Sequence, residues 1–221
     1  MEVVRDLHFV SGVLSDSNVY VLGKDEITLI DVGTGDNLNR LFKVIDSCNL
    51  DSKDIKQVIV THAHIDHIGG LSMISELLNP RICAPSEETP YIEKGDDYMI
   101  LAWMFNSKFE PVRVDTKLNE GDRIHAEEFS LRVLHTPGHT KGSICLYDEE
   151  RKILFSGDTV FSGGGFGRVD LPTGNAEDLR KSLLELSKLE VEYLLPGHMS
   201  IVTKGVHESI KRSYMNIEFL L

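Results

Sequence analysis

The chain has 221 residues, of which 41% are hydrophobic and 26% are charged, as is ordinary for a soluble globular protein. Its formal net charge of -12 at pH 7 disfavours a nucleic-acid partner, because like charges repel the phosphate backbone. There is no apolar run of 18 or more residues and no basic N-terminal region followed by an apolar one, so we expect no membrane span, no signal peptide and a cytoplasmic location.

The first third of the chain alternates strand and helix patterns. Two short β-rich runs flank a Gly-Lys-Asp-Glu turn and predict a hairpin over residues 19–30. Apolar residues at helical spacing predict a helix over residues 36–48. A buried strand at residues 58–60 then precedes a helix over residues 68–78, which we expect to stop at the Asn-Pro pair that follows.

Residues 81–115 have a less regular pattern. Within them the segment from Tyr98 to Phe109 is rich in Met, Trp and Phe. We favour a helix that packs in the core. The alternative is a lid or wall over the functional site, in which Trp103 and Phe105 would contact the substrate.

The second half repeats the style of the first. Asn175 is the expected N-cap of a helix that has Glu177 and Asp178 in its first turn. The sequence has no linker or low-complexity tract, which predicts a single domain over residues 1–221. The expected elements are strands at residues 130–135, 143–148, 152–156 and 193–195, and helices at residues 176–189 and 204–220.

The most informative stretch is an H-x-H-x-D-H run directly after the predicted strand at residues 58–60. Imidazole is the commonest metal-binding side chain near neutral pH, and carboxylate suits the same cations. The run lies on a strand-to-helix turn, where α/β proteins place catalytic groups, so it predicts a metal site. A polar turn with solvated histidines is the alternative. The candidate ligands are His62, His64, Asp66 and His67.

Three further candidate ligands each follow a predicted strand and lie in a glycine-containing loop, namely His139, Asp158 and His198. One zinc ion needs only three or four ligands, so seven groups predict two divalent metals that share a carboxylate and a water. Among the other histidines, His135 is interpreted as a satisfied residue behind the site or in the core. The rest are interpreted as surface or structural residues: His8, His125 and His207.

The cysteines are odd in number and widely separated, with no C-x-x-C pair. This pattern favours reduced thiols over a disulfide framework. Cys145 lies in a predicted strand and is interpreted as a small buried hydrophobe. The other two are Cys48 and Cys83.

These residues, in this order and rough spacing, resemble the metallo-β-lactamase superfamily over essentially the whole chain. Supporting stretches are residues 29–33 (Leu-Ile-Asp-Val-Gly) and 136–140 (Thr-Pro-Gly-His-Thr). The resemblance implies an α/β fold, a four-layer αββα sandwich, with Asp31 supporting the site from behind. It implies one metal on His62, His64 and His139, and a second on Asp66, His67 and His198, with Asp158 bridging. Zinc is the first expectation, with iron or manganese as alternatives.

Residues 157–161 and the glycine-rich stretch from Gly163 to Arg168 resemble the glyoxalase II-like branch, whose enzymes hydrolyse thioesters such as hydroxyacylglutathione. Typical members have an extra C-terminal helical domain that helps to bind glutathione. This chain ends some twenty residues after His198, so only a short glyoxalase II-like protein is implied, and the thiol carrier stays open. Class B β-lactamases resemble it less, since several have Cys where this chain has Asp158.

The expected function is binuclear hydrolysis of a small-molecule thioester, in which a hydroxide held between two metals attacks the carbonyl carbon. Asp66 is expected to steady the nucleophilic water. Arg168 would bind a substrate carboxylate or anchor its loop. Three alternatives stay open: a mononuclear Fe(II) persulfide dioxygenase using His62, His139 and Asp158, a phosphodiesterase or nuclease of the same fold, and a metal-dependent scaffold.

Overall fold

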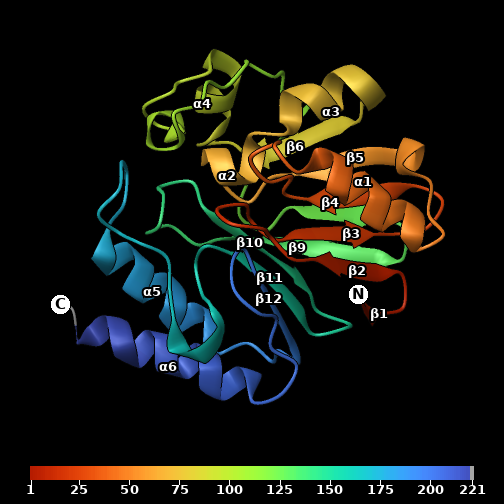
Figure 1. Ribbon diagram of the computed structural model, residues 1–221. Coiled ribbons are helices and arrows are strands. Elements are labelled where there is room, and N and C mark those ends of the chain that lie inside the picture. The colour runs from red at the N-terminus through yellow and green to blue at the C-terminus, as the bar shows by residue number, and fades with distance from the viewer. Residues whose placement is uncertain (220–221) are drawn as a thin grey trace. The chain divides into compact units, whose positions relative to one another are not determined.

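A computed structural model describes residues 1–219, which fold into two compact units (Figure 1). The N-terminal unit comprises Met1–Leu118 and His125–Phe129. The C-terminal unit comprises Asn119–Ile124 and the described residues from Ser130 onward. Each unit is described by itself below, and the single domain over residues 1–221 stays a prediction.

The N-terminal unit contains a mixed sheet with the strands in the order β1-β2-β3-β4-β5-β6-β7. Strands β1 to β4 pair antiparallel, and β4 to β7 pair parallel. The hairpin predicted over residues 19–30 is confirmed, with Tyr20 opposite Ile30. The strands are β1 (Glu2–Val4), β2 (Leu7–Val10), β3 (Val19–Leu22), β4 (Ile27–Ile30), β5 (Ile55–Ile59), β6 (Arg81–Pro85) and β7 (Thr116–Leu118).

Helices α1 (Leu38–Ser47) and α3 (Leu71–Leu78) bury their apolar residues against one face of this sheet. Leu41 and Ile45 of α1 and Ile74 of α3 lie in the same core as Val58 of β5. The helix predicted over residues 36–48 is therefore confirmed, with slightly shorter bounds. The other helices of the unit are short: 3-10 helix η1 (Ser52–Asp54), α2 (Ile65–Ile68), α4 (Thr89–Lys94) and 3-10 helix η2 (Ala102–Phe105).

The helix predicted over residues 68–78 begins earlier and is interrupted. Helix α2 (Ile65–Ile68) comes first, and a Gly-Gly pair separates it from α3. A Cβ on Gly69 would lie 2.2 Å from the carbonyl oxygen of Thr34, so the chain passes too close to its neighbour for a side chain. Helix α3 ends at Asn79 in the left-handed conformation, before the proline, as expected.

The helix favoured for residues 98–109 is wrong, although the core contacts are present. Leu101 and Asn106 have positive φ angles of 64° and 48°, so the backbone forms only the short η2 between them. Ile100, Ala102 and Phe109 are buried in the core. Trp103, by contrast, is 57% exposed.

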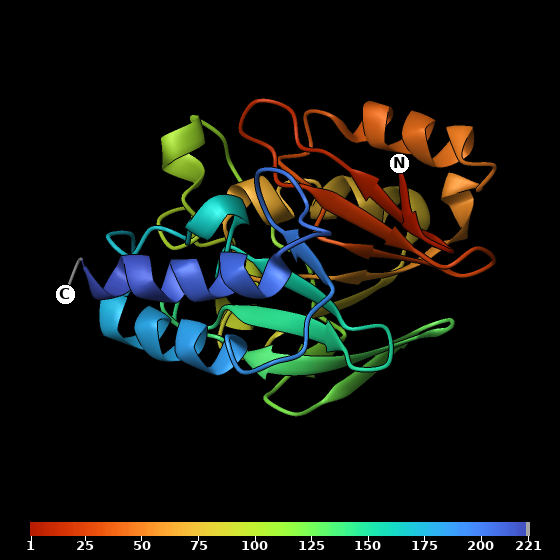
Figure 2. The same ribbon diagram turned by 90° about the horizontal axis from the view of Figure 1, so that it is seen from below.

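The second sheet belongs largely to the C-terminal unit and has the order β12-β11-β10-β9-β8. Strands β11 and β12 pair parallel, with Leu154 opposite Leu194. Helices α5 (Ala176–Leu186) and α6 (Val206–Glu218) lie side by side, and Leu183 and Ile210 pack into the same core as Cys145 (Figure 2). The strands are β8 (Arg123–Ala126), β9 (Phe129–His135), β10 (Ile144–Asp148), β11 (Ile153–Gly157) and β12 (Tyr193–Pro196), with 3-10 helix η3 at Ser162–Gly164.

The predictions for this unit hold in their main points. Asn175 caps α5 by accepting a hydrogen bond from the Asp178 N–H at 3.0 Å, although the helix ends before the predicted residue 189. Helix α6 follows the predicted range, whose last residue, 220, lies outside the described residues. Cys145 is fully buried, and this burial raises the pKa of its thiol to about 11. Over residues 1–219, no helix has both the length and the apolar character needed to cross a membrane.

Candidate metal centre

The His/Asp cluster of the N-terminal unit lies at the end of β5 and continues into α2. His62 and His64 occupy the turn, and His64 is the N-cap residue of α2. Asp66 and His67 belong to the helix itself. All three histidines are buried, and Asp66 is partly exposed, so the alternative of a polar turn with solvated histidines is wrong.

One nitrogen of His62 and one of His64 have the spacing of two ligands of the same metal ion. His62 Nε2 and His64 Nδ1 lie 3.2 Å apart, and the ring centroids of His62 and His67 are separated by 4.1 Å. Two nitrogens bound to one tetrahedral zinc at about 2.0–2.1 Å would be about 3.3–3.4 Å apart. The His62 and His64 side chains therefore fit one cation without rearrangement.

Asp31 is hydrogen-bonded to the Nδ1 side of the His67 ring directly and to that of the His62 ring through Thr61. Its Oδ1 accepts a hydrogen bond from the Thr61 N–H, and its Oδ2 accepts from Thr61 Oγ1 and from His67 Nδ1, all at 2.8 Å. Because Thr61 donates its hydroxyl hydrogen to Asp31, it accepts one from His62 Nδ1 at 3.1 Å. Both rings are then protonated at Nδ1 and keep the lone pair of Nε2 for a metal. The role at a metal site that the resemblance implies for Asp31 stays a prediction.

A second carboxylate that the sequence interpretation missed holds the loop beside Asp66. Asp16 is buried, and its Oδ1 accepts a hydrogen bond from the Thr34 N–H at 2.8 Å. The next residue, Ser17, donates its N–H to the carbonyl oxygen of Asp66 at 3.0 Å. Asp16 lies outside any strand or helix pattern, so only its type, common in turns that bond their own backbone, could have marked it.

The C-terminal unit brings the other three candidate ligands together. His139, Asp158 and His198 lie in the loops after β9, β11 and β12, respectively. Asp158 Oδ2 is 3.6 Å from His139 Nε2 and also 3.6 Å from His198 Nε2. One carboxylate is thus placed at the same distance from two imidazoles.

The ring of His139 is held by the main chain of the glycine-rich stretch. Its Nδ1 lies 2.8 Å from the carbonyl oxygen of Arg168. A carbonyl can only accept, so His139 donates from Nδ1 and keeps its Nε2 lone pair for a cation. The Arg168 guanidinium is exposed and pairs with Asp170 at 2.8 Å, which favours the loop-anchoring interpretation of this side chain. The same pairing raises the pKa of Arg168 and lowers that of Asp170.

Helix α5 supports the loop that carries His139. Ser182 Oγ donates to the carbonyl oxygen of Pro137, and the Asn175 N–H donates to that of Gly138, both at 2.8 Å. A Cβ on Gly138 would lie 2.3 Å from Leu179 Cα, so the loop backbone lies directly on the helix. The position of His139 is therefore coupled to that of α5.

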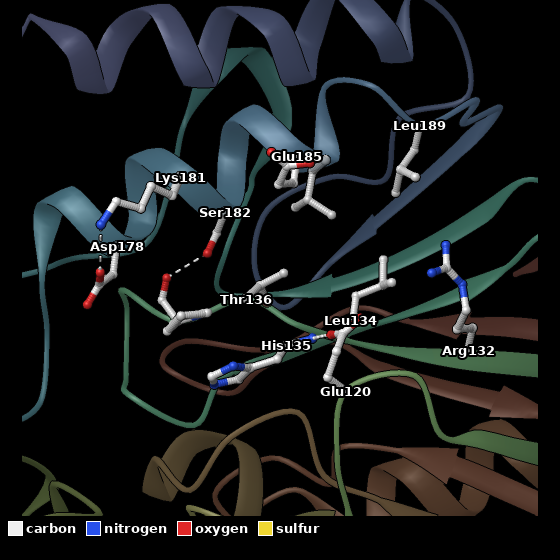
Figure 3. A pocket seen from close by; sticks show the side chains of 12 residues that line it. Glu120, Arg132, Leu134, His135, Thr136, Asp178, Lys181, Ser182, Glu185 and Leu189 are labelled. Carbon is white, nitrogen blue, oxygen red and sulfur yellow. Dashed lines mark hydrogen bonds and ion pairs between the residues drawn. The ribbon is translucent and has the colours of Figure 1, made fainter.

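A cavity of about 490 Å³ lies between α5 and β9 in the C-terminal unit, with Leu134, Lys181 and Glu185 among its lining residues (Figure 3). His135 also lines it and is exposed, with Nε2 2.9 Å from the Lys141 carbonyl oxygen. The interpretation of His135 as a core residue is wrong, because the ring lies at the end of β9 and faces this open cavity.

The α/β units and the buried His/Asp cluster, which could hold a metal ion, are those of a metal-binding α/β protein. A family model described as the metallo-beta-lactamase superfamily matches residues 12–198, and the chain belongs to this superfamily.

Two relatives are enzymes of thioesters by name. The acyl-coenzyme A thioesterase MBLAC2 of Gallus gallus is 36% identical over 163 residues, which are 65% of this chain and 56% of that protein, so the match spans little more than half of its length. The hydroxyacylglutathione hydrolase GloC of Haemophilus influenzae is 28% identical over 198 residues, 85% of this chain and 88% of that one.

Solved structures share the fold. The metallo-beta-lactamase family protein TTHA1429 from Thermus thermophilus has a TM-score of 0.83 and 22% identity, covering 99% of this chain and 81% of that one. TTHA1623, solved in a di-iron-bound form, has a TM-score of 0.75 and 29% identity, covering 91% and 96%. The predicted fold class, the metallo-β-lactamase sandwich, is confirmed.

Proposed function

We propose that this chain is a binuclear metal-dependent hydrolase of thioesters that join an acyl group to a small thiol. The observation that carries the proposal is the placement of Asp158 Oδ2 at 3.6 Å from each of two imidazole nitrogens. Two relatives that are named for thioester hydrolysis support the substrate class. One cation would take His62, His64 and His139 and the other Asp66, His67 and His198, with Asp158 shared.

The donor set fits such cations. It consists of imidazole nitrogens and carboxylate oxygens, which suit Zn, Fe and Mn in a binuclear site. The rings of His62, His67 and His139 each have an acceptor at Nδ1, so their Nε2 lone pairs are available for metal. We propose zinc as the metal, with iron as the alternative that the di-iron form of TTHA1623 supports.

When bound, divalent ions of this kind would lower the pKa of a coordinated water to about 7 and would polarise a substrate carbonyl. Asp66 is the residue we propose to hold and orient the attacking water, because its carboxylate is partly exposed while the Ser17 N–H fixes its backbone. A thiolate leaves readily, since a thiol has an ordinary pKa near 8.5. The site therefore needs no separate general acid.

The remaining parts of the proposal concern partners and location. We propose a small-molecule substrate, and the charge of -12 disfavours a nucleic acid. We propose a cytoplasmic location. Disulfides are rare in that compartment, and Cys48, Cys83 and Cys145 are free thiols, which supports the proposal.

The test combines metal analysis with thioester hydrolysis. We expect two metal ions per chain and hydrolysis of S-lactoylglutathione or an acyl-coenzyme A. In His62→Ala and Asp158→Ala, we expect metal content and activity to fall together, with activity lower by more than about 100-fold, because even residues behind a metal site contribute about 10–100-fold. His135→Ala, at an exposed histidine outside the ligand set, is the matched control and should retain both. Full activity in a metal-depleted variant would contradict the proposal, as would one iron per chain with O₂ consumed on a persulfide.

A further inference from the structure

The glycine-rich loop from Gly163 to Arg168 is held in place by the last helix of the described chain. Ser213 Oγ donates to the carbonyl oxygen of Gly165, and Asn216 Nδ2 donates to that of Gly164, both at 2.8 Å. Ser213 and Asn216 are three residues apart and so lie on the same face of α6. A Cβ on Gly164 would lie 2.5 Å from Arg212 Cγ, which shows how closely the loop follows the helix.

The other end of the same loop lies against two of the candidate ligands. The Arg168 carbonyl oxygen accepts the hydrogen bond from His139 Nδ1 at 2.8 Å. A Cβ on Gly167 would lie 2.8 Å from His139 Nδ1 and 2.0 Å from the carbonyl oxygen of Asp158. The path of the loop backbone therefore determines where the acceptor for His139 lies, and only a residue without a side chain fits at position 167.

We propose that Ser213 and Asn216 are positioning residues for His139 and act through this loop. The inference rests on the proposed role of His139 as a metal ligand. When the two donors hold the loop, the Arg168 carbonyl keeps the proton of His139 on Nδ1 and the Nε2 lone pair toward Asp158. When they are removed, the loop loses two of its attachments to α6, and the ring loses part of the constraint on its orientation.

The primary test compares Zn(II) affinity, measured by competition with a chelator, between the full-length chain and its Ser213→Ala/Asn216→Ala variant. Alanine is the strongest helix former, so these changes do not weaken α6 itself. We expect Zn(II) to bind about tenfold more weakly in the double variant, at the lower end of the 10–100-fold effect of residues behind a metal site. Lys211→Ala, at an exposed position of the same helix, is the matched control and should bind Zn(II) as the parent chain does.

A second variant separates the hydrogen bond from the shape of the side chain. Asn216→Asp has the same size but presents an oxygen where Asn216 presents its N–H donor, so it should lose as much Zn(II) affinity as Asn216→Ala. Ser213→Ala could disturb the packing of α6, but Asn216 is exposed, so Asn216→Ala and Asn216→Asp can be compared with the parent chain on their own. Retained affinity in Asn216→Asp would contradict the role of the donor.

The final readout follows His139 directly. In the Zn(II)-loaded parent chain, long-range proton–nitrogen NMR should show His139 protonated at Nδ1, with slow solvent exchange. In the double variant we expect that proton to exchange faster. No Zn(II) binding by the parent chain would overturn the proposed function, and this inference with it. Zn(II) binding by the parent chain, with unchanged affinity and an unchanged His139 signal in the double variant, would overturn this inference alone.

Discussion

Replacing Asp31 by asparagine tests the hydrogen bonds behind the metal ligands of the N-terminal unit. Asp31 is buried, and its two oxygens accept three hydrogen bonds, two from Thr61 and one from His67, all at 2.8 Å. Asparagine has the same size but only one oxygen. Its amide group, in either orientation, therefore faces at least one donor that it cannot accept from.

The size of the effect follows from these bonds. A hydrogen bond to a charged group contributes about 1.5–3 kcal/mol, so losing one should lower the free energy of unfolding by about that amount. His67 also loses the carboxylate that keeps its proton on Nδ1. A residue of this kind contributes about 10–100-fold to metal affinity, which corresponds to about 1.4–2.8 kcal/mol of binding free energy.

Two measurements separate these effects: urea unfolding of the metal-free protein, and Zn(II) competition with a chelator. Asp148→Asn is the matched control, because Asp148 is equally buried and accepts from the Arg151 N–H at 2.9 Å and the Ser130 N–H at 3.3 Å. The control should lose stability and keep its Zn(II) affinity. If Asp31→Asn binds Zn(II) as tightly as Asp148→Asn at similar stability, then Asp31 has only a structural role and the reasoning is refuted.

Two further predictions concern stability. In Gly138→Ala the new Cβ would lie 2.3 Å from Leu179 Cα, so we expect urea unfolding to show a free energy of unfolding lower by about 1–3 kcal/mol. Gly121 also has a positive φ angle but has open space around it, so Gly121→Ala should lose less stability. Equal losses in the two variants would contradict the packing argument. Burial raises the pKa of Glu127, but the backbone N–H groups of residues 24–26 outweigh burial and lower this pKa below the usual value of 4.5. The contribution of Glu127 to stability is therefore present above the pKa of the unfolded state and is lost as pH falls through the pKa of the folded state. Glu127→Gln should therefore be less stable than the parent chain at pH 7 and equally stable in strong acid, and a difference that does not change with pH would contradict the assignment.

The sequence identifies the candidate side chains that the structure brings together within each unit, because their chemistry and position are both local properties. His62 follows the apolar run that forms β5, and His139 and Asp158 lie in the loops after β9 and β11, which are also apolar runs. The fold class follows from the resemblance that these residues and their order carry. The hairpin and α5 are predictable because their turn residues and N-cap are encoded within a few positions.

The failures have equally specific causes. Strands β1, β7 and β8 have three or four residues, too few for a period of two to stand out. Strand β7 in addition pairs with a strand distant in the sequence, with Thr116 opposite Cys83 of β6. The segment from Tyr98 to Phe109 has the composition of a core helix. Its backbone angles at Leu101 and Asn106 depend on tertiary contacts, such as the Ile65 N–H that donates to the Ile100 carbonyl at 2.7 Å.

The acceptors behind the histidines show why the support of the site is harder to predict than the ligands. His67 bonds a carboxylate and His62 a hydroxyl, whereas His139 bonds the main-chain carbonyl of Arg168. Every residue type has a main-chain carbonyl, so the sequence cannot mark this acceptor. It draws attention to the guanidinium of Arg168, whereas His139 bonds the main-chain carbonyl of that residue. What then matters for His139 is the path of the loop, which is set by the absence of a side chain at Gly167 and by the donors of α6. The donors of α6 contact no ligand ring themselves, so they are recognised only from the structure, by the loop backbone that they hold.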